Sequence, residues 1–200
     1  MLEKALAEDL DRGGANLALG RRATVRTAAL INGTAAHTVE FDDIFKFGIY
    51  HPGAPTISAA LAAAQHQSAT GEELLRAIIA GYEISTRIGA AMGRAHYKYW
   101  HNTGTIGVFG STPSVGLLLG LKRDQLVHAM ATVTTFAAAL QQAFRMDSMS
   151  KPLHAGRAAE AGVLAALVAR EGVIGSLDVI DGDAGFGVAM GDGPDWSKAV

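Results

Sequence analysis

The chain has 200 residues, of which 49% are hydrophobic and 18% charged, with a formal net charge of −2. This composition excludes a disordered chain and a broad electropositive surface for nucleic acid. No apolar run reaches the roughly 18 residues of a membrane span. The absence of cysteine excludes disulfides, a thiol nucleophile and a cysteine-ligated iron–sulfur cluster. We therefore expect a cytoplasmic protein with one hydrophobic core.

Helical patterns dominate, and runs of β-branched residues are nearly missing, so the sequence predicts an all-α fold. Residues 1–22 alternate acidic and basic side chains and are expected to form a charged N-terminal segment before a domain over residues 23–200. Predicted helices occupy residues 23–41, 55–68, 70–92, 105–120, 126–144 and 155–170. The many alanines and glycines in these helices predict close helix contacts.

Two helix ends carry specific signals. Thr70 and Glu73 have the spacing of a capping box, in which each side chain satisfies a free backbone N–H of the first turn. Gly172 stands where the last predicted helix must stop. Residues 96–104 and 145–152 are polar and are predicted to be loops. The glycine-rich tail after Gly172 is predicted to be loop with short helical turns.

The first polar cluster follows the helix predicted at residues 23–41. Glu40, Asp42 and Asp43 place three carboxylates at a helix C-terminus, where they oppose the helix dipole. His51 precedes the next helix, where an imidazole and a helix N-terminus can face an anion together. The alternative is a solvated acidic turn followed by a capping histidine.

Two further clusters contain histidine. His101 precedes a helix start rich in glycine and threonine, and its alternative is a structural histidine buried between helices. Lys151 and His154 lie three residues apart at a predicted helix start and can offer two basic groups to one ligand. A lysine between apolar helices can have a lowered pKa and serve as acid, base or anion anchor, whereas a solvated lysine does none of these.

Several common sites are not indicated. No histidine pair has HExxH or HxH spacing, so we predict no metal, and a site of three scattered histidines is the remaining metal alternative. The glycines at 104, 107 and 110 do not follow the dinucleotide pattern GxGxxG, and no strand precedes them. No GxSxG sequence indicates a serine nucleophile. We predict no cofactor.

The polar clusters occur in a fixed order along the chain: INGTAAH (31–37), EFDD (40–43), HP (51–52), HNTGT (101–105), KPLHAG (151–156) and GDAGF (182–186). This order resembles the MmgE/PrpD family, which includes 2-methylcitrate dehydratase, cis-aconitate decarboxylase and iminodisuccinate epimerase. The resemblance runs from about residue 23 to the end of the chain.

The resemblance implies a large helical domain, a smaller α/β lid domain, a homodimer and metal-free chemistry on di- or tricarboxylates. Family members are more than twice as long as this chain. We therefore expect a truncated helical domain without the α/β lid, incomplete as an enzyme on its own.

The resemblance also implies roles for individual residues. It places family site residues at Glu40, His51, His101 and Lys151. With the neighbouring polar residues included, we predict catalysis by His101, Lys151 and His51, and substrate binding by Glu40, Asp42 and His154. In the decarboxylase-like pattern a threonine follows the acidic motif and an aspartate opens it; this chain has Ile44 and Glu40 at those positions.

These features predict a lyase of the 2-methylcitrate dehydratase type, a hydro-lyase that removes a proton α to a carboxylate without a metal. One alternative is an isomerase of the iminodisuccinate epimerase type, which returns the proton to the opposite face. The other is an inactive, truncated helical module that dimerises.

Overall fold

The computed structural model describes residues 1–200, and most of them are helical, which confirms the predicted all-α class. None of the helices is both long and apolar enough to cross a membrane. The α-helices are α1 (Leu2–Ala5), α2 (Val25–His37), α3 (Gly53–Gln67), α4 (Gly71–Met92), α5 (Asn102–Thr105), α6 (Val108–Leu118), α7 (Arg123–Thr134), α8 (Ser150–Arg170) and α9 (Phe186–Met190). Short 3₁₀ turns are η1 (Ala7–Asp9), η2 (His96–Lys98), η3 (Gln141–Phe144) and η4 (Trp196–Lys198).

A small hairpin near the N-terminus is the one sheet of the fold. Strands β1 (Leu10–Asn16) and β2 (Arg22–Ala23) pair antiparallel, with an irregular register. Leu10, Ala15 and Ala23 are buried in the same cluster as residues of α2 and α3, so this segment belongs to the core. Sequence patterns did not predict these strands because Gly13 and Gly14 make the segment look like a loop; Gly13 has a positive φ of 71°.

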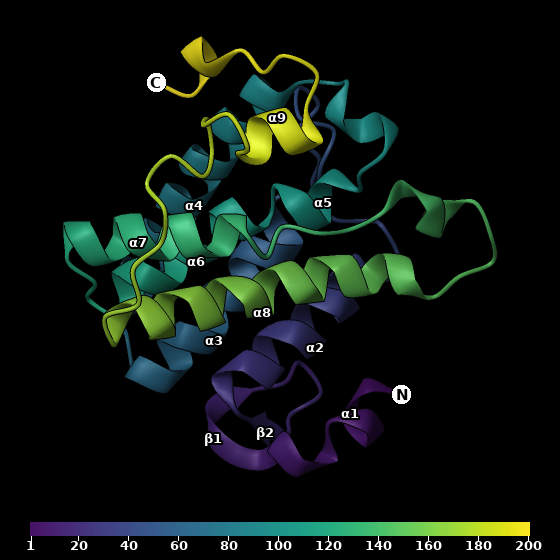
Figure 1. The fold of residues 1–200 in the computed structure, drawn as a ribbon. Helices are drawn as coiled ribbons and strands as arrows, with labels where there is room; N and C mark the ends of the chain where they lie inside the picture. The colour runs from purple at the N-terminus through teal and green to yellow at the C-terminus, as the bar shows by residue number, and fades with distance from the viewer.

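Helix α8 crosses the centre of the molecule, with α2 and the hairpin on one side and α6 and α7 on the other (Figure 1). Helices α2 and α8 approach so closely at Gly33 and Gly156 that neither position has room for a side chain. A Cβ atom at Gly33 would lie 3.0 Å from the Cα of Gly156, and one at Gly156 would overlap Thr34 and the Leu30 carbonyl. This contact fixes the end of α2 against the start of α8.

Some predicted helix bounds are wrong. Helix α7 ends at Thr134 rather than at residue 144, because the next residues return to cover the loop at 96–101. There the backbone N–H of His101 donates to the carbonyl of Ala139 at 3.0 Å, and Trp100 forms a β-bridge with Leu140. Helix α8 starts at Ser150, five residues before the predicted start. The predicted helix at 105–120 is α6 (Val108–Leu118), and the predicted loop at 96–104 contains the 3₁₀ turn η2 and most of α5.

The two predicted end signals are confirmed. Thr70 and Glu73 form the complete capping box of α4, with a distance of 3.2 Å from the Glu73 backbone nitrogen to the Thr70 hydroxyl. Gly172 has a φ of 97° and follows the last turn of α8. The C-terminal end of α2 and the N-terminal ends of α3 and α8 then meet at one place, which holds the polar clusters.

Candidate active site

Four of the seven histidines meet between the ends of α2, α3, α5 and α8. The ring centroid of His37 lies 4.7 Å from that of His51 and 5.4 Å from that of His101, and the His37 and His101 rings are stacked. The His101 and His154 centroids are 5.2 Å apart. Packing alone does not favour four basic side chains in one place, because any two protonated members repel each other.

His101 and His154 share one hydrogen bond. Their Nδ1 atoms are 2.9 Å apart, so one nitrogen carries a proton and the other accepts it. Burial lowers the pKa of His101 to about 2, and the His154 imidazole acts in the same direction. Burial also lowers the pKa of His154. Both rings are therefore neutral near pH 7 in the free chain, and the pair holds one exchangeable proton between them.

Asp42 serves two imidazoles. Its Oδ2 accepts a hydrogen bond from His37 Nδ1 at 2.9 Å, and its Oδ1 lies 3.4 Å from His51 Nδ1. The Asp42 side chain is 11% exposed and that of His37 is wholly buried, so water screens this contact little. Burial lowers the pKa of His37, while the Asp42 carboxylate opposes that shift.

Lys151 and Glu40 form an ion pair at the edge of the cluster. Lys151 lies in the first turn of α8, is 24% exposed and has its pKa lowered by burial. Glu40 follows the end of α2 with a left-handed backbone, φ 53°, which is uncommon for a residue other than glycine. The pair brings a partly exposed cation to within reach of the imidazoles.

Phe144 connects the lysine to the histidines. Its ring centroid is 4.4 Å from Lys151 Nζ and 4.7 Å from the centroid of His101, which it meets edge to face. The sequence predicted a helix over this residue and assigned it no role. The ring covers part of both basic groups, and this apolar cover contributes to the burial that lowers the pKa of His101.

Asp43 belongs to the scaffold rather than to the cluster. Its Oδ1 accepts from the backbone N–H of Gly53 at 3.0 Å, and its Oδ2 accepts from the hydroxyl of Tyr82 at 2.9 Å. These bonds fasten the first residue of α3 to α4, which sets the position of His51. Phe41 and Ile44 of the same loop are 94% and 61% exposed. Ile44 therefore offers neither a polar group nor a buried contact to the cluster.

The structure brings all six sequence-predicted site residues together: His51, His101, Lys151, Glu40, Asp42 and His154. Their roles in binding and catalysis stay predictions. Sequence reasoning gave no role to His37, which connects both halves of the cluster. The signal that identifies it is its place four residues after Gly33, which puts the two residues on one face of α2.

His37, Asp42 and His51 are also residue types that bind metals, and their ligand atoms lie within 4.8 Å of one another. The sequence predicted no metal because no local motif joins these residues. This group has two histidines and one aspartate, so it differs from the site of three scattered histidines that was the remaining metal alternative. The same groups also satisfy one another by hydrogen bonding, so residue type alone does not distinguish the two arrangements.

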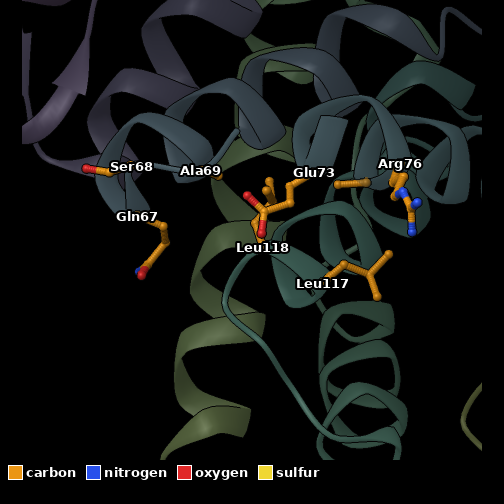
Figure 2. A pocket seen from close by; sticks show the side chains of 8 residues that line it. Gln67, Ser68, Ala69, Glu73, Arg76, Leu117 and Leu118 are labelled. Carbon is orange, nitrogen blue, oxygen red and sulfur yellow. The ribbon is translucent and has the colours of Figure 1, made fainter. Parts of the chain in front are cut away.

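Other hollows of the surface are lined by residues outside the histidine cluster. Figure 2 shows one of about 400 Å³ between the α3–α4 turn and the end of α6. Its charged groups already have partners: Arg76 donates to Glu72 at 2.6 Å, and the Glu73 carboxylate accepts from the Thr70 backbone at 2.7 Å. This hollow is lined by an exposed surface ion pair and a helix cap, and unlike the histidine cluster it contains no buried polar atom without a partner.

Comparison with known proteins gives one family. The model of the MmgE/PrpD N-terminal domain matches residues 1–199. A cis-aconitate decarboxylase of Homo sapiens is 33% identical over 80% of this chain, and that of Mus musculus is 31% identical over 80%. A cis-aconitate decarboxylase-like protein of Aspergillus oryzae is 31% identical over 85% of this chain. These matches cover 34%, 33% and 37% of the relatives, so the chain spans about a third of their length.

Proposed function

The chain belongs to the MmgE/PrpD family, and from that premise we propose that it provides the helical part of a lyase for a small di- or tricarboxylate. The proposed reaction removes a proton from the carbon next to a carboxylate. The observation that supports this most is the meeting of Lys151, His51 and His101, three basic groups far apart in the sequence, at the N-terminal ends of α3 and α8.

Lys151 is proposed to bind a substrate carboxylate in exchange for Glu40. The Glu40 side chain is 46% exposed, and ion pairs of this exposure contribute little stability, so exchange for another carboxylate costs little. The helix dipoles of α3 and α8 favour negative charge at the same place. His154 and Asp42 are proposed to complete the binding site, His154 as a donor to the substrate and Asp42 as the group that orients an imidazole.

His51, His101 and Lys151 are the proposed acid and base groups. Bound carboxylates favour the protonated forms of nearby imidazoles, so substrate binding opposes the burial that keeps His101 neutral in the free chain. One neutral imidazole can then accept the proton from carbon, while a neighbouring protonated group donates to the leaving group. The positive charge that remains stabilises the charge that develops on the substrate carboxylate.

We propose dehydration of a hydroxy acid, as in 2-methylcitrate dehydratase, as the reaction. The carbon–oxygen bond breaks and the hydroxyl leaves as water with a proton from the acid group. The names of the relatives favour decarboxylation instead, in which carbon dioxide leaves and the acid group protonates the carbon. Ile44, which stands where the decarboxylase-like pattern has threonine, is the departure that argues against decarboxylation.

A binding measurement tests the site in this chain. Citrate, used as a tricarboxylate probe, should raise the melting temperature, and its triester should not. Lys151→Met should weaken citrate binding at least tenfold while the chain still folds, because one positive charge has left the cluster. Lys4→Met is the matched control, because this exposed lysine on α1 has no ion pair. Equal citrate binding by both variants would contradict the proposal.

Activity measurements separate the reactions. Because this chain is expected to be incomplete as an enzyme, water elimination from 2-methylcitrate and carbon dioxide release from cis-aconitate should be followed in a full-length homologue, with and without EDTA. We expect the first reaction to proceed in EDTA, and Lys151→Met to reduce its turnover about 100-fold, the contribution of an acid–base group. Activity that a chelator abolishes, together with one bound metal ion per chain, would contradict the metal-free mechanism.

The proposal includes a cytoplasmic homodimer. Helices α3 and α4 expose the apolar side chains of Ile57, Leu61, Leu75 and Ile79, and groups of exposed apolar residues are typical of protein contacts. Analytical ultracentrifugation checks this association: a species of twice the chain mass supports it, and a monomer at high concentration contradicts it.

The two alternatives predict different results. An epimerase predicts proton exchange without elimination. An inactive module predicts no citrate binding.

A further inference from the structure

His37 is the last residue of α2 and the only member of the histidine cluster with no exposed surface. Its Nδ1 bonds to Asp42, its ring stacks on His101, and its Nε2 has no hydrogen-bond partner. A buried polar atom without a partner costs about 1–3 kcal/mol. A histidine whose only task was to fill the core would be replaceable by an apolar residue without this cost.

His96 shows the contrasting arrangement in the same chain. It is also buried, but its Nδ1 bonds to the Met190 carbonyl at 2.8 Å and its Nε2 to the Thr105 hydroxyl at 2.6 Å. Both ring nitrogens of His96 are therefore satisfied by the scaffold. His37 has instead one nitrogen committed to a carboxylate and one left free.

Asp42 and His51 also have polar atoms without hydrogen-bond partners. The Oδ1 of Asp42 is buried and lacks a hydrogen-bond partner. The Nδ1 of His51 is also buried without a partner, although the two atoms are only 3.4 Å apart. A carboxylate only accepts hydrogen bonds, so a lone pair on His51 Nδ1 would face another lone pair at this distance. A proton on His51 Nδ1 satisfies both atoms after a small ring rotation.

From these contacts we infer that His37 is a positioning residue: it holds the Asp42 carboxylate so that one oxygen meets each imidazole, and both His37 and His51 carry their proton on Nδ1. The Nε2 atom of each ring then has a free lone pair. His37 thereby determines which nitrogen of His51 is available as a base, without touching substrate itself. This histidine–carboxylate–histidine clamp deepens the proposed function and rests on it for its purpose.

A metal ion on the same three residues is the competing arrangement, and the nearby ammonium of Lys151, which is paired with Glu40, opposes it weakly. The positive charge of Lys151 acts on His37 and on His154. A divalent cation would stand beside this ammonium with one carboxylate among its ligands. Protons on the two Nδ1 atoms satisfy the same buried atoms with no added charge.

The test reads the ring protons of this chain directly and needs no turnover. Long-range ¹H–¹⁵N correlation spectra of the labelled, chelator-treated chain report which nitrogen of each histidine carries the proton. We expect the Nδ1–H form for both His37 and His51. In His37→Phe, which keeps a ring beside His101, His51 should revert to the Nε2–H form that free imidazole prefers. In His37→Asn, whose amide N–H replaces Nδ1–H, His51 should keep Nδ1–H.

His96→Phe is the matched control, because it also replaces a buried histidine. It should lower stability and leave the His51 form unchanged. An Nε2–H form of His51 in the unsubstituted chain, or no change in His37→Phe, would overturn the clamp. If His37→Phe does not fold, His37→Leu gives the same reading of His51, because it also removes the Nδ1–H that holds Asp42. One equivalent of metal on the chain purified without chelator, with metal-shifted ring nitrogens, would overturn it in favour of the metal site. Citrate binding is measured separately, so the clamp can fail while the proposed function stands.

Discussion

Two regions of the α2–α8 contact lie within one helical turn of each other and have opposite character. At Gly33 and Gly156 the helices are so close that neither position accepts a Cβ atom. One turn away, His37 and His154 belong to a cluster in which several buried polar atoms have no hydrogen-bond partner. The first region is tightly packed, whereas the second retains polar atoms that are free to form hydrogen bonds.

This difference shows how a rigid support and a reactive site coexist on the same two helices. The close crossing holds the backbones in one place, so the polar side chains at the ends need not contribute to helix packing. Unsatisfied groups destabilise a fold, and they persist only where the surrounding structure is firm enough to hold them. The crossing supplies that firmness.

The largest expected effect comes from disturbing the crossing. Gly156→Ala should lower the free energy of unfolding by about 3 kcal/mol, the upper range for overpacking, because the new methyl group overlaps Thr34 and the Leu30 carbonyl. Urea denaturation measures this loss. Gly71→Ala is the control, since a Cβ atom there meets nothing within 4 Å, and it should change stability little. Equal effects of the two substitutions would show that the crossing is not tightly packed.

The site should respond to acid where the crossing does not. The pKa of His101 is lowered to about 2 in the folded chain, so on acidification the unfolded chain takes up this proton first. Stability is therefore complete above the ordinary histidine pKa of about 6.5 and falls below it, by about 1.4 kcal/mol per pH unit for each such ring. From about pH 6.5 to about pH 5 this is a loss of about 2 kcal/mol for His101.

Urea denaturation across this pH range checks the sign and the slope. His101→Gln should have a shallower dependence on pH than the unsubstituted chain, because one depressed imidazole has been removed. Gly71→Ala should keep the full slope. A slope that is the same in all three chains would show that His101 does not titrate as a buried, neutral ring.

The smallest expected effect lies at the start of α4, far from both regions, and provides a reference for the size of the other two effects. Thr70→Ala removes the hydroxyl that accepts from the Glu73 backbone N–H and should cost about 1 kcal/mol. Thr70→Ser retains the hydroxyl and should recover most of this loss. Thermal denaturation of the two variants measures the difference, and an equally low melting temperature for both would contradict the role of the cap.

Local signals in the sequence predicted the parts of the fold that local chemistry determines. The start of α4 follows from Thr70 and Glu73, and the end of α8 from Gly172, because each satisfies backbone groups within a few residues. The end of α7 at Thr134 was not predictable in this way. It depends on a hydrogen bond between Ala139 and His101, residues that are distant in the sequence.

The site shows the same limit. Its six predicted residues were singled out as polar clusters along the chain and joined into one site by the resemblance to a family, and the structure supplied the contacts among them. His37 lies in an alanine-rich helix where a histidine carries no local signal, and its importance comes from a ring stack and a carboxylate contact that only the fold creates. Asp43, by contrast, stands beside Asp42 in the sequence and yet holds the scaffold.

At position 40, selection for stability and selection for the ion pair with Lys151 favour different residues. The left-handed backbone of Glu40 is the conformation in which glycine is favoured over other residues by about 1 kcal/mol or more. Drift toward a more stable chain would therefore favour glycine there, and the same replacement would leave Lys151 without its carboxylate. A lineage that retains an acidic residue at this position forgoes that stability. The identity of residue 40 across the family thus becomes a record of which members have been selected for the ion pair.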